Sequence, residues 1–272
     1  MHPIEYKLKI LTEESKSRGY NNLLTRNILK EYLQDIILFI IYNSDYKDIT
    51  FYGGSCLRKI YNLNRLSEDL DFETLEPVAL DNLKTTLLNY FKTEKFEMVS
   101  AHVQSNNNVN RCTLKFEIMN FLELSDKKNE KLNVKIEINN ISNKYDTEYT
   151  PYSKDIYSMV VKHYTLPILM STKMLACIFR IFRKGDTDVS IKGRDFYDLI
   201  WYMQKGVIPN EDVFKANSLT SKEAFNRIDD IVKNIKSKDL IIDLEPLFDN
   251  NIYINNWCNN FHSFYNKYRK KY

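Results

Sequence analysis

The chain has 272 residues, 43% of them hydrophobic and 28% charged, and its formal net charge is only +3. This length suits one large domain or two modest ones, and the composition excludes a disordered or collagen-like chain. Such an even charge balance does not by itself indicate nucleic-acid binding, and no apolar run approaches the roughly 18 residues of a membrane span.

The numbers and positions of cysteine and glycine residues restrict the possible metal sites and backbone conformations. The four cysteines are far apart and form no CxxC pair, which argues against zinc and favours a reduced setting. The first residues contain no apolar signal core, so we expect a cytoplasmic protein without membrane association. Only 6 of 272 residues are glycine, against a typical share of roughly 7%, yet two are adjacent at Gly53 and Gly54. Such a pair indicates a close approach of the backbone.

The first predicted elements lead directly to this glycine pair. Residues 21–42 carry a broad apolar stripe that is typical of a helix. A β-branched and aromatic run at 49–52 predicts a buried strand that stops at the glycines, and residues 55–61 have helical spacing. The two glycines are therefore expected on a strand-to-helix turn.

The next segment, residues 66–73, alternates apolar and polar side chains and predicts a second strand. Residues two apart in a strand share one face, so Asp69, Asp71 and Glu73 should point the same way. The sequence thus places a row of carboxylates shortly after the glycine turn.

The remaining pattern divides the chain into two parts. A predicted helix at 79–97 is followed by strands at about 97–104, 110–119 and 132–141. After residue 150 helices dominate, with candidates at 170–184, 194–205, 209–216, 220–236 and 250–269. This shift predicts an α+β fold, with a mixed β-sheet domain and flanking helices over residues 1–160 and a C-terminal helical bundle domain over residues 161–272.

The glycine turn and the acidic strand together indicate phosphate chemistry. Backbone N–H groups at Gly54 and Ser55, where a helix begins, can hold phosphate oxygens. Two carboxylates on one strand face, Asp69 and Asp71, can hold Mg²⁺, a hard ion that prefers oxygen ligands. Such an ion bridges a triphosphate and an attacking hydroxyl in an in-line displacement.

At these residues the sequence resembles the DNA polymerase β-like nucleotidyltransferases, whose signature is a Gly-Gly or Gly-Ser turn followed by Asp-x-Asp. The segments 51–58 and 65–72 are more specifically similar to the AbiEii/AbiGii toxin branch, which includes the MenT-type enzymes. Two later segments, 171–180 with Lys173 and 192–198 with Arg194 and Asp195, resemble that branch's later motifs. The resemblance covers roughly residues 45–202.

This resemblance implies an NTP-dependent nucleotidyltransferase fold that uses Mg²⁺ or Mn²⁺, and a bacterial toxin that works with a cognate antitoxin. Some relatives transfer nucleotides to tRNA ends, so an RNA acceptor is implied as well. The implied catalytic residues are Asp69, Asp71, Glu137, Lys173 and Asp195. The implied nucleotide contacts are Gly53, Gly54, Ser55, Arg58, Arg65, Ser67 and Lys173. The implied metal ligands are Asp69, Asp71 and Glu137.

Glu137 is the expected third carboxylate because this fold adds one from a neighbouring strand. It lies on the polar face of the strand at 132–141, and Glu117 has the same geometry on the strand before it. Glu137 or Asp195 would then help to activate the acceptor, while Lys173 would neutralise charge on the leaving pyrophosphate in a cleft between the domains. Basic residues expected near that cleft are Arg180, Arg183, Lys184, Lys192 and Arg194.

Each residue also has an ordinary structural interpretation. Asp69, Asp71 and Glu137 could belong to solvated strand faces, and Arg65 could pair with Glu68 or Glu73. Lys173 could extend past apolar neighbours to water, Asp195 could favour the start of a helix, and Asp198 could pair with Arg194. Two functional alternatives also remain: a non-catalytic nucleotide- or partner-binding module of the same fold, and a phosphotransferase acting on the terminal phosphate.

Overall fold

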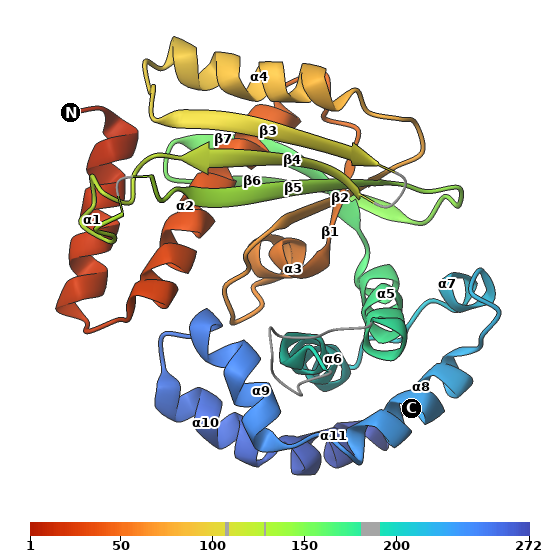
Figure 1. Ribbon diagram of the computed structural model, residues 1–272. Helices are drawn as coiled ribbons and strands as arrows, with labels where there is room; N and C mark the ends of the chain where they lie inside the picture. The colour runs from red at the N-terminus through yellow and green to blue at the C-terminus, as the bar shows by residue number, and fades with distance from the viewer. Residues whose placement is uncertain (107–108, 128, 181–190) are drawn as a thin grey trace. The chain divides into compact units, whose positions relative to one another are not determined.

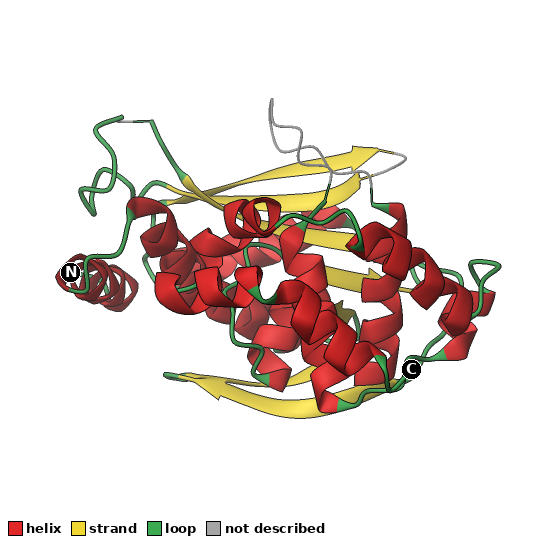
Figure 2. Cartoon of the chain, turned by 90° about the horizontal axis from the view of Figure 1, so that it is seen from below, coloured by secondary structure: helices red, strands yellow, loops and turns green. Residues whose placement is uncertain are grey.

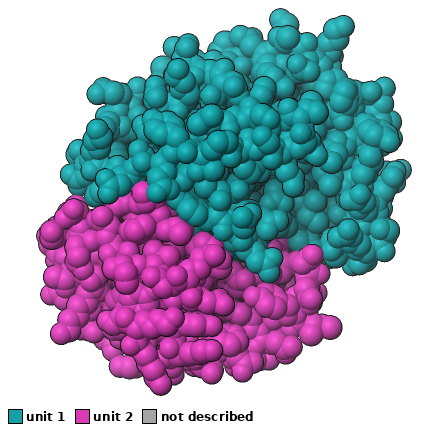
Figure 3. All heavy atoms as spheres, turned by 180° about the vertical axis from the view of Figure 1, so that it is seen from behind, with its two compact units in different colours: residues 1–163 teal, residues 164–272 magenta. Residues whose placement is uncertain are grey.

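The computed structural model describes residues 1–106, 109–127, 129–180 and 191–272. These residues form two compact units, Met1–His163 and Tyr164–Tyr272, which Figure 3 colours separately. No described helix has the length and apolar character that crossing a membrane requires.

The first unit contains one mixed sheet of seven strands within the described residues, in the order β3-β4-β5-β2-β1-β7-β6 (Figure 1). The strands are β1 (Thr50–Tyr52), β2 (Leu70–Thr74), β3 (Val99–Asn106), β4 (Val109–Phe116), β5 (Leu132–Asn140), β6 (Thr147–Lys154) and β7 (Tyr157–Tyr164). The helices of this unit are α1 (Pro3–Ser17), α2 (Asn22–Tyr42), α3 (Gly53–Tyr61) and α4 (Leu80–Thr93).

The two faces of the central strands differ in polarity. Along β5 the even-numbered residues from Leu132 to Ile138 are buried, whereas Asn133 is exposed and Lys135 and Glu137 are half-buried. Helices α2 and α4 contact each other and pack against β5, β3 and β4, which covers the apolar side. The polar side chains therefore line the opposite face, as strand alternation requires.

The second unit is helical. Its elements are α5 (Leu166–Phe179), α6 (Gly193–Lys205), α7 (Glu211–Lys215), α8 (Ser221–Val232), α9 (Ser237–Leu244), a short 3₁₀ turn η1 (Glu245–Leu247), α10 (Asn251–Asn259) and α11 (Phe261–Arg269). Figure 2 shows the strands in yellow and the helices in red. The predicted α+β class, with a mixed sheet followed by helices, is confirmed.

Several elements differ from the sequence-based expectation. No helix is predicted from the sequence at α1. This helix begins with a capping box between His2 and Glu5. It buries only a narrow stripe of residues, so its apolar periodicity is weak. Strand β6 is mostly exposed and contains Pro151, which is typical of an edge strand. The predicted helix 250–269 is two helices separated at Asn260. The predicted helix 170–184 starts too late, since α5 runs from Leu166 to Phe179; residues 181–184 of that prediction lie outside the described residues.

Candidate active site

The glycine pair lies on a strand-to-helix turn, as predicted. Strand β1 ends at Tyr52, and α3 begins at Gly53, which has φ +76°. Only glycine adopts this backbone conformation readily. An added Cβ at Gly53 would stand 3.2 Å from both Cβ and Cγ of Asp71. The turn therefore abuts the carboxylate-bearing side chain of Asp71 directly.

Gly54 faces two further predicted residues. A Cβ at this position would lie 2.6 and 3.2 Å from the terminal guanidinium nitrogens of Arg65 and 3.1 Å from Ser67 Oγ. Arg65 is buried and donates to the Leu66 carbonyl at 2.9 Å, so its guanidinium has little room to retreat. The structure thus brings Gly53, Gly54, Arg65 and Asp71 together at one corner of the first unit.

Gly54→Ala is expected to displace the Arg65 guanidinium. Overpacking of this kind costs about 1–3 kcal/mol of stability, and we expect a loss of activity of at least tenfold, chiefly through a higher KM for the NTP. Chemical denaturation and steady-state kinetics would measure both effects. Gly19→Ala is the control for activity: a Cβ there meets nothing within 4 Å, but φ is +70°, so the variant should lose stability through backbone strain and keep its activity. Equal activity of Gly54→Ala and the wild type would contradict the close-approach interpretation.

Ser55 and Asp69 are joined by a hydrogen bond. Ser55 is fully buried and its Oγ donates to the backbone carbonyl of Asp69. This bond ties the first turn of α3 to the residue just before β2, because Asp69 precedes the first strand residue, Leu70. The Ser55 hydroxyl therefore fixes the position of Asp69, and the part of Ser55 that suits a phosphate is its backbone N–H.

Sheet pairing places Asp71 in a polar row. Asp71 is the Cα partner of Tyr52 on β1 and of Glu137 on β5, so the side chains of Asp71 and Glu137 leave the same face at a spacing of roughly 5 Å. Glu117 follows the last residue of β4, six residues beyond Arg111, the β4 partner of Glu137. At about 3.4 Å per strand residue it lies roughly 20 Å away. Of the two candidates, Glu137 is the neighbour of Asp71.

Tyr52 also belongs to this row, and the sequence did not single it out. Burial raises the pKa of the Tyr52 phenol well above its ordinary value, and the negative charges of Asp71, Glu73 and Glu137 raise it further. Its oxygen accepts a hydrogen bond from Asn139 Nδ2 at 2.8 Å. The phenol therefore stays protonated beside the carboxylates.

The predicted metal ligands Asp69, Asp71 and Glu137 all offer carboxylate oxygens, which are the donors that a hard divalent ion prefers. In the present arrangement, however, the described residues contain no group of three or more His, Cys, Asp or Glu side chains that could hold a metal ion. Glu137 Oε1 instead accepts from Arg111 Nε at 2.9 Å, and Lys135 Nζ is 4.0 Å from Asp69 Oδ1. The predicted three-ligand set is therefore not assembled.

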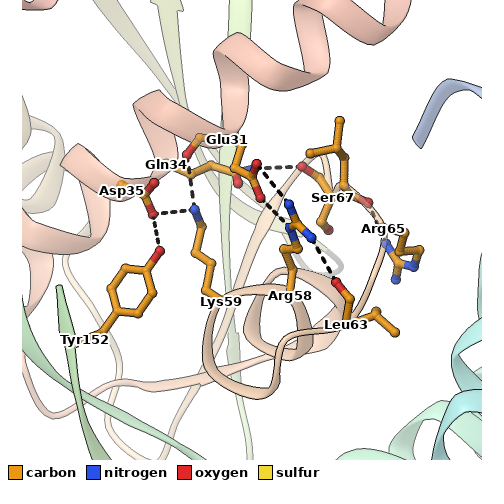
Figure 4. A network of polar contacts seen from close by, with 10 residues as sticks. Glu31, Gln34, Asp35, Arg58, Lys59, Leu63, Arg65, Ser67 and Tyr152 are labelled. Carbon is orange, nitrogen blue, oxygen red and sulfur yellow. Dashed lines mark hydrogen bonds and ion pairs between the residues drawn. The ribbon is translucent and has the colours of Figure 1, made fainter. Parts of the chain in front are cut away.

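Arg58 has a different setting from the one predicted. Its Nε donates to Glu31 Oε1 at 2.6 Å and its Nη1 to the Leu63 carbonyl at 3.2 Å (Figure 4). Because these contacts attach α3 to α2, we interpret Arg58 as an anchor and leave it out of the nucleotide site. Gln34 Nε2 similarly donates to the Ser67 carbonyl at 3.1 Å, which holds the loop carrying Ser67.

The later predicted residues form a buried charged cluster within the second unit. Lys173 Nζ on α5 lies 2.8 Å from Asp195 Oδ1 and 2.9 Å from Asp198 Oδ2, both on α6. Arg180 Nη1 lies 2.8 Å from Asp195 Oδ2. Asp198 thus pairs with Lys173. Arg194 Nε lies 4.0 Å from Asp243 Oδ2. The interpretation of Lys173 as reaching water is wrong, because its side chain is only 11% exposed.

The charges in this cluster set the proton affinity of Asp195. Burial raises the pKa of Asp195, but Lys173 and Arg180 outweigh it and hold the pKa at about 2. Burial, together with the positive charges of Arg194 and Arg180, lowers the pKa of Lys192 to about 8. Arg183 and Lys184, also expected near the cleft, lie outside the described residues.

Asp195 is expected to contribute to acid sensitivity. Its folded pKa of about 2 is below the ordinary 3.8, so its contribution is full above pH 3.8 and is lost as pH falls towards 2. The difference corresponds to about 2 kcal/mol of unfolding free energy. Urea titrations at pH 5 and pH 2.5 should show a smaller acid loss in Asp195→Asn than in the wild type. Asp230→Asn, at an exposed acid, is the control; an unchanged acid loss in Asp195→Asn would contradict this assignment.

Known protein families and solved structures include relatives of this chain. The chain matches the family described as "Nucleotidyl transferase AbiEii toxin, Type IV TA system" over residues 37–267. No curated protein matches. The crystal structure of JHP933 from Helicobacter pylori has a TM-score of 0.53 at 18% identity and covers 90% of this chain and 92% of its own.

A second Helicobacter pylori structure, of a protein proposed to be a nucleotidyltransferase, has a TM-score of 0.52 at 19% identity and covers 89% of this chain and 94% of its own. At such identities these two structures support the fold alone. The family match extends over most of the sequence and includes the glycine turn, the acidic strand and the Lys173 cluster. The chain belongs to the AbiEii nucleotidyl transferase toxin family, and it is a nucleotidyltransferase.

Proposed function

We propose that the protein binds an NTP with a divalent metal ion and transfers the nucleotidyl group to an acceptor hydroxyl, with the 3′ end of a tRNA as the acceptor. The observation that carries this proposal is the corner where Gly53 abuts Asp71 and Gly54 abuts Arg65. A triphosphate needs backbone donors and a cation on one side and oxygen ligands for its metal on the other. This corner offers both kinds of group.

The phosphate side of the proposed site is the start of α3. No side chain caps the N-terminus of this helix, so its first N–H groups suit phosphate oxygens, which the helix dipole also favours. The Arg65 guanidinium adds a charged donor beside Gly54. Because both glycines lack a Cβ, phosphate oxygens can approach the backbone closely.

The metal side of the proposed site is the polar row on the sheet. Asp69 and Asp71 would hold the ion, and Glu137 would be the third ligand. When bound, such an ion neutralises charge on the triphosphate and promotes in-line displacement. The chain's own contribution is to fix the carboxylates, through the bond from Ser55 to Asp69 and the strand pairing of Asp71.

In the second unit, the proposal assigns Lys173 to charge neutralisation on the leaving pyrophosphate. Its ammonium is held by Asp195 and Asp198 at 2.8 and 2.9 Å. A general base works best with a pKa near the working pH, and Asp195 has a pKa of about 2. We therefore assign Asp195 to positioning Lys173 and leave activation of the acceptor to Glu137.

Transfer can be tested with each labelled NTP, total tRNA and Mg²⁺. The wild type should label RNA, and the double variant Asp69→Ala/Asp71→Ala should not. Equal labelling by both, or labelling by neither, would refute the transferase proposal. Mass spectrometry identifies the added group, since a terminal phosphate alone would indicate a phosphotransferase. Calorimetric NTP binding without any product would indicate a non-catalytic module.

The family also implies a cognate antitoxin, which we propose is encoded beside this protein. Induced expression should then arrest growth, and co-expression of the neighbouring reading frame should restore it. Arrest by the wild type but not by the Asp69→Ala/Asp71→Ala variant would connect toxicity to transfer. Equal arrest by both proteins would separate toxicity from this site.

A further inference from the structure

Arg111 makes a close ion pair with the proposed third metal ligand. It lies on β4 as the Cα partner of Glu137 on β5. Its Nε and Nη2 lie 2.9 and 2.6 Å from Glu137 Oε1. The two side chains are 27% and 31% exposed, so an ion of modest size can still reach them. Two N–H groups of one guanidinium therefore converge on a single carboxylate oxygen.

The pair extends the polar row across four strands. Tyr52, Asp71, Glu137 and Arg111 are successive Cα partners on β1, β2, β5 and β4. Glu137 thus has Asp71 on one side and Arg111 on the other, and its carboxylate is bonded on the Arg111 side. In this arrangement the described residues contain no group of three acidic side chains that could hold a metal ion.

We propose that Arg111 is a resident counter-ion that a divalent metal must displace before Glu137 can join Asp71 as a ligand. The inference rests on the proposed function. Glu137 Oε1 cannot serve a guanidinium and a metal ion equally well, because each cation repels the other and both need the same lone pairs. The metal alone therefore binds weakly, and the cost of displacing Arg111 is part of its affinity.

The displaced guanidinium stays beside the site because Arg111 is anchored in the middle of β4. There it can donate to a phosphate of the incoming nucleotide. The phosphate then replaces Glu137 as the anionic partner of Arg111. Metal and NTP binding are then coupled through one side chain. If Arg111 instead stayed on Glu137 throughout, Glu137 would take no part in metal binding.

Titration of the protein with Mn²⁺ alone, read by the electron paramagnetic resonance signal of the unbound ion, tests the proposal without turnover. Arg111→Met should lower the Kd for Mn²⁺ about five- to tenfold relative to the wild type, the range expected for removing a competing, partly exposed charge. Lys131→Met is the matched control, since it removes a cation that pairs with Glu117 at the end of the same sheet. It should leave the Kd unchanged.

The Asp71→Asn variant separates the two ways in which this test can fail. If Asp71→Asn weakens Mn²⁺ binding but Arg111→Met does not tighten it, the counter-ion proposal is overturned and the metal site stands. If Asp71→Asn has no effect, the proposed metal site itself is overturned, and the inference with it.

A second measurement covers an Arg111→Met variant that folds poorly. The variant Arg111→Lys keeps the positive charge but loses the guanidinium that converges on Glu137. The effect of Glu137→Gln on the Kd for Mn²⁺ is then measured in this variant and in the wild type. Glu137→Gln should weaken Mn²⁺ binding more in the Arg111→Lys background. An equal effect in both backgrounds overturns the proposal.

Discussion

Replacing Asp71 with Asn is expected to lower kcat/KM for nucleotidyl transfer by about 10³-fold or more, which corresponds to roughly 4 kcal/mol of transition-state stabilisation. The amide keeps the shape of the side chain but removes the charge that a divalent ion requires. Gly53 packs against this side chain, and a Cβ added at Gly53 would stand 3.2 Å from Asp71 Cγ, so a near-isosteric change disturbs the corner least. Incorporation of label from the preferred NTP would measure the loss.

Glu73→Gln is the matched control for this prediction. Glu73 lies two residues further along β2, with Thr50 and Asn139 as its Cα partners, and therefore shares a strand face with Asp71. It is not adjacent to the glycine turn, so its removal should change kcat/KM less than about threefold. If both variants lost activity equally, the effect would come from the negative charge of this sheet face in general and not from the position of Asp71 beside the glycine turn.

The corner could be predicted because its signal is local. A strand run, two glycines, a helical run and an Asp-x-Asp strand follow one another within residues 49–73, and each pattern has a short-range physical cause. The structure confirms the turn at Gly53 and the pairing that places Asp71 beside it. Arg65, which lies against Gly54, is also close to the glycine pair in the sequence.

The polar partners of the site could not be predicted because they depend on sheet register. Arg111 and Glu137 are 26 residues apart, and a shift of one residue between β4 and β5 would send one of them to the other face. The alternation of buried Cys112, Leu114 and Phe116 puts Arg111 on the polar face of β4, but this pattern does not identify its partner on β5. The same holds for Tyr52 and Asn139.

Strand β7 is absent from the sequence-based prediction for a different reason. Strand β7 alternates buried Tyr157, Met159 and Val161 with exposed Ser158 and Val160, a period that the sequence carries and that a strand assignment could have used. Buried His163 follows this pattern and makes hydrogen bonds with Tyr61 and Thr150.

The buried pair of Lys59 and Asp35 was also invisible in the sequence, because both residues lie on helices where charged side chains ordinarily face water. Lys59 on α3 contacts Asp35 Oδ1 on α2, and Tyr152 donates to the same oxygen at 2.9 Å (Figure 4). The side chains of Lys59 and Asp35 are 2% and 3% exposed. This pair, with the bond between Arg58 and Glu31, fixes the helix whose first turn forms the candidate phosphate site.

Lys59→Met is expected to lower the free energy of unfolding by about 3–5 kcal/mol, because it leaves Asp35 as a buried charge without its cation. Burial already raises the pKa of Asp35, and Lys59 opposes that rise. Without Lys59 the pKa of Asp35 should rise further. A folded pKa above the unfolded one favours the folded state at low pH, so the variant should gain stability from pH 7 to pH 5. Urea unfolding at both values would measure the change.

The double variant Lys59→Met/Asp35→Leu decides whether the charge or the packing is responsible. Removing both partners should recover most of the loss, since a well-packed apolar pair is often as stable as a buried ion pair. Tyr152 then lacks its acceptor, so adding Tyr152→Phe should recover a further 1 kcal/mol or so. Because Arg58 and Gln34 still attach α3 and the Ser67 loop to α2, the double variant should keep its transfer activity. A double variant no more stable than Lys59→Met would mean that the loss comes from the packing of the lysine side chain and not from an unpaired charge.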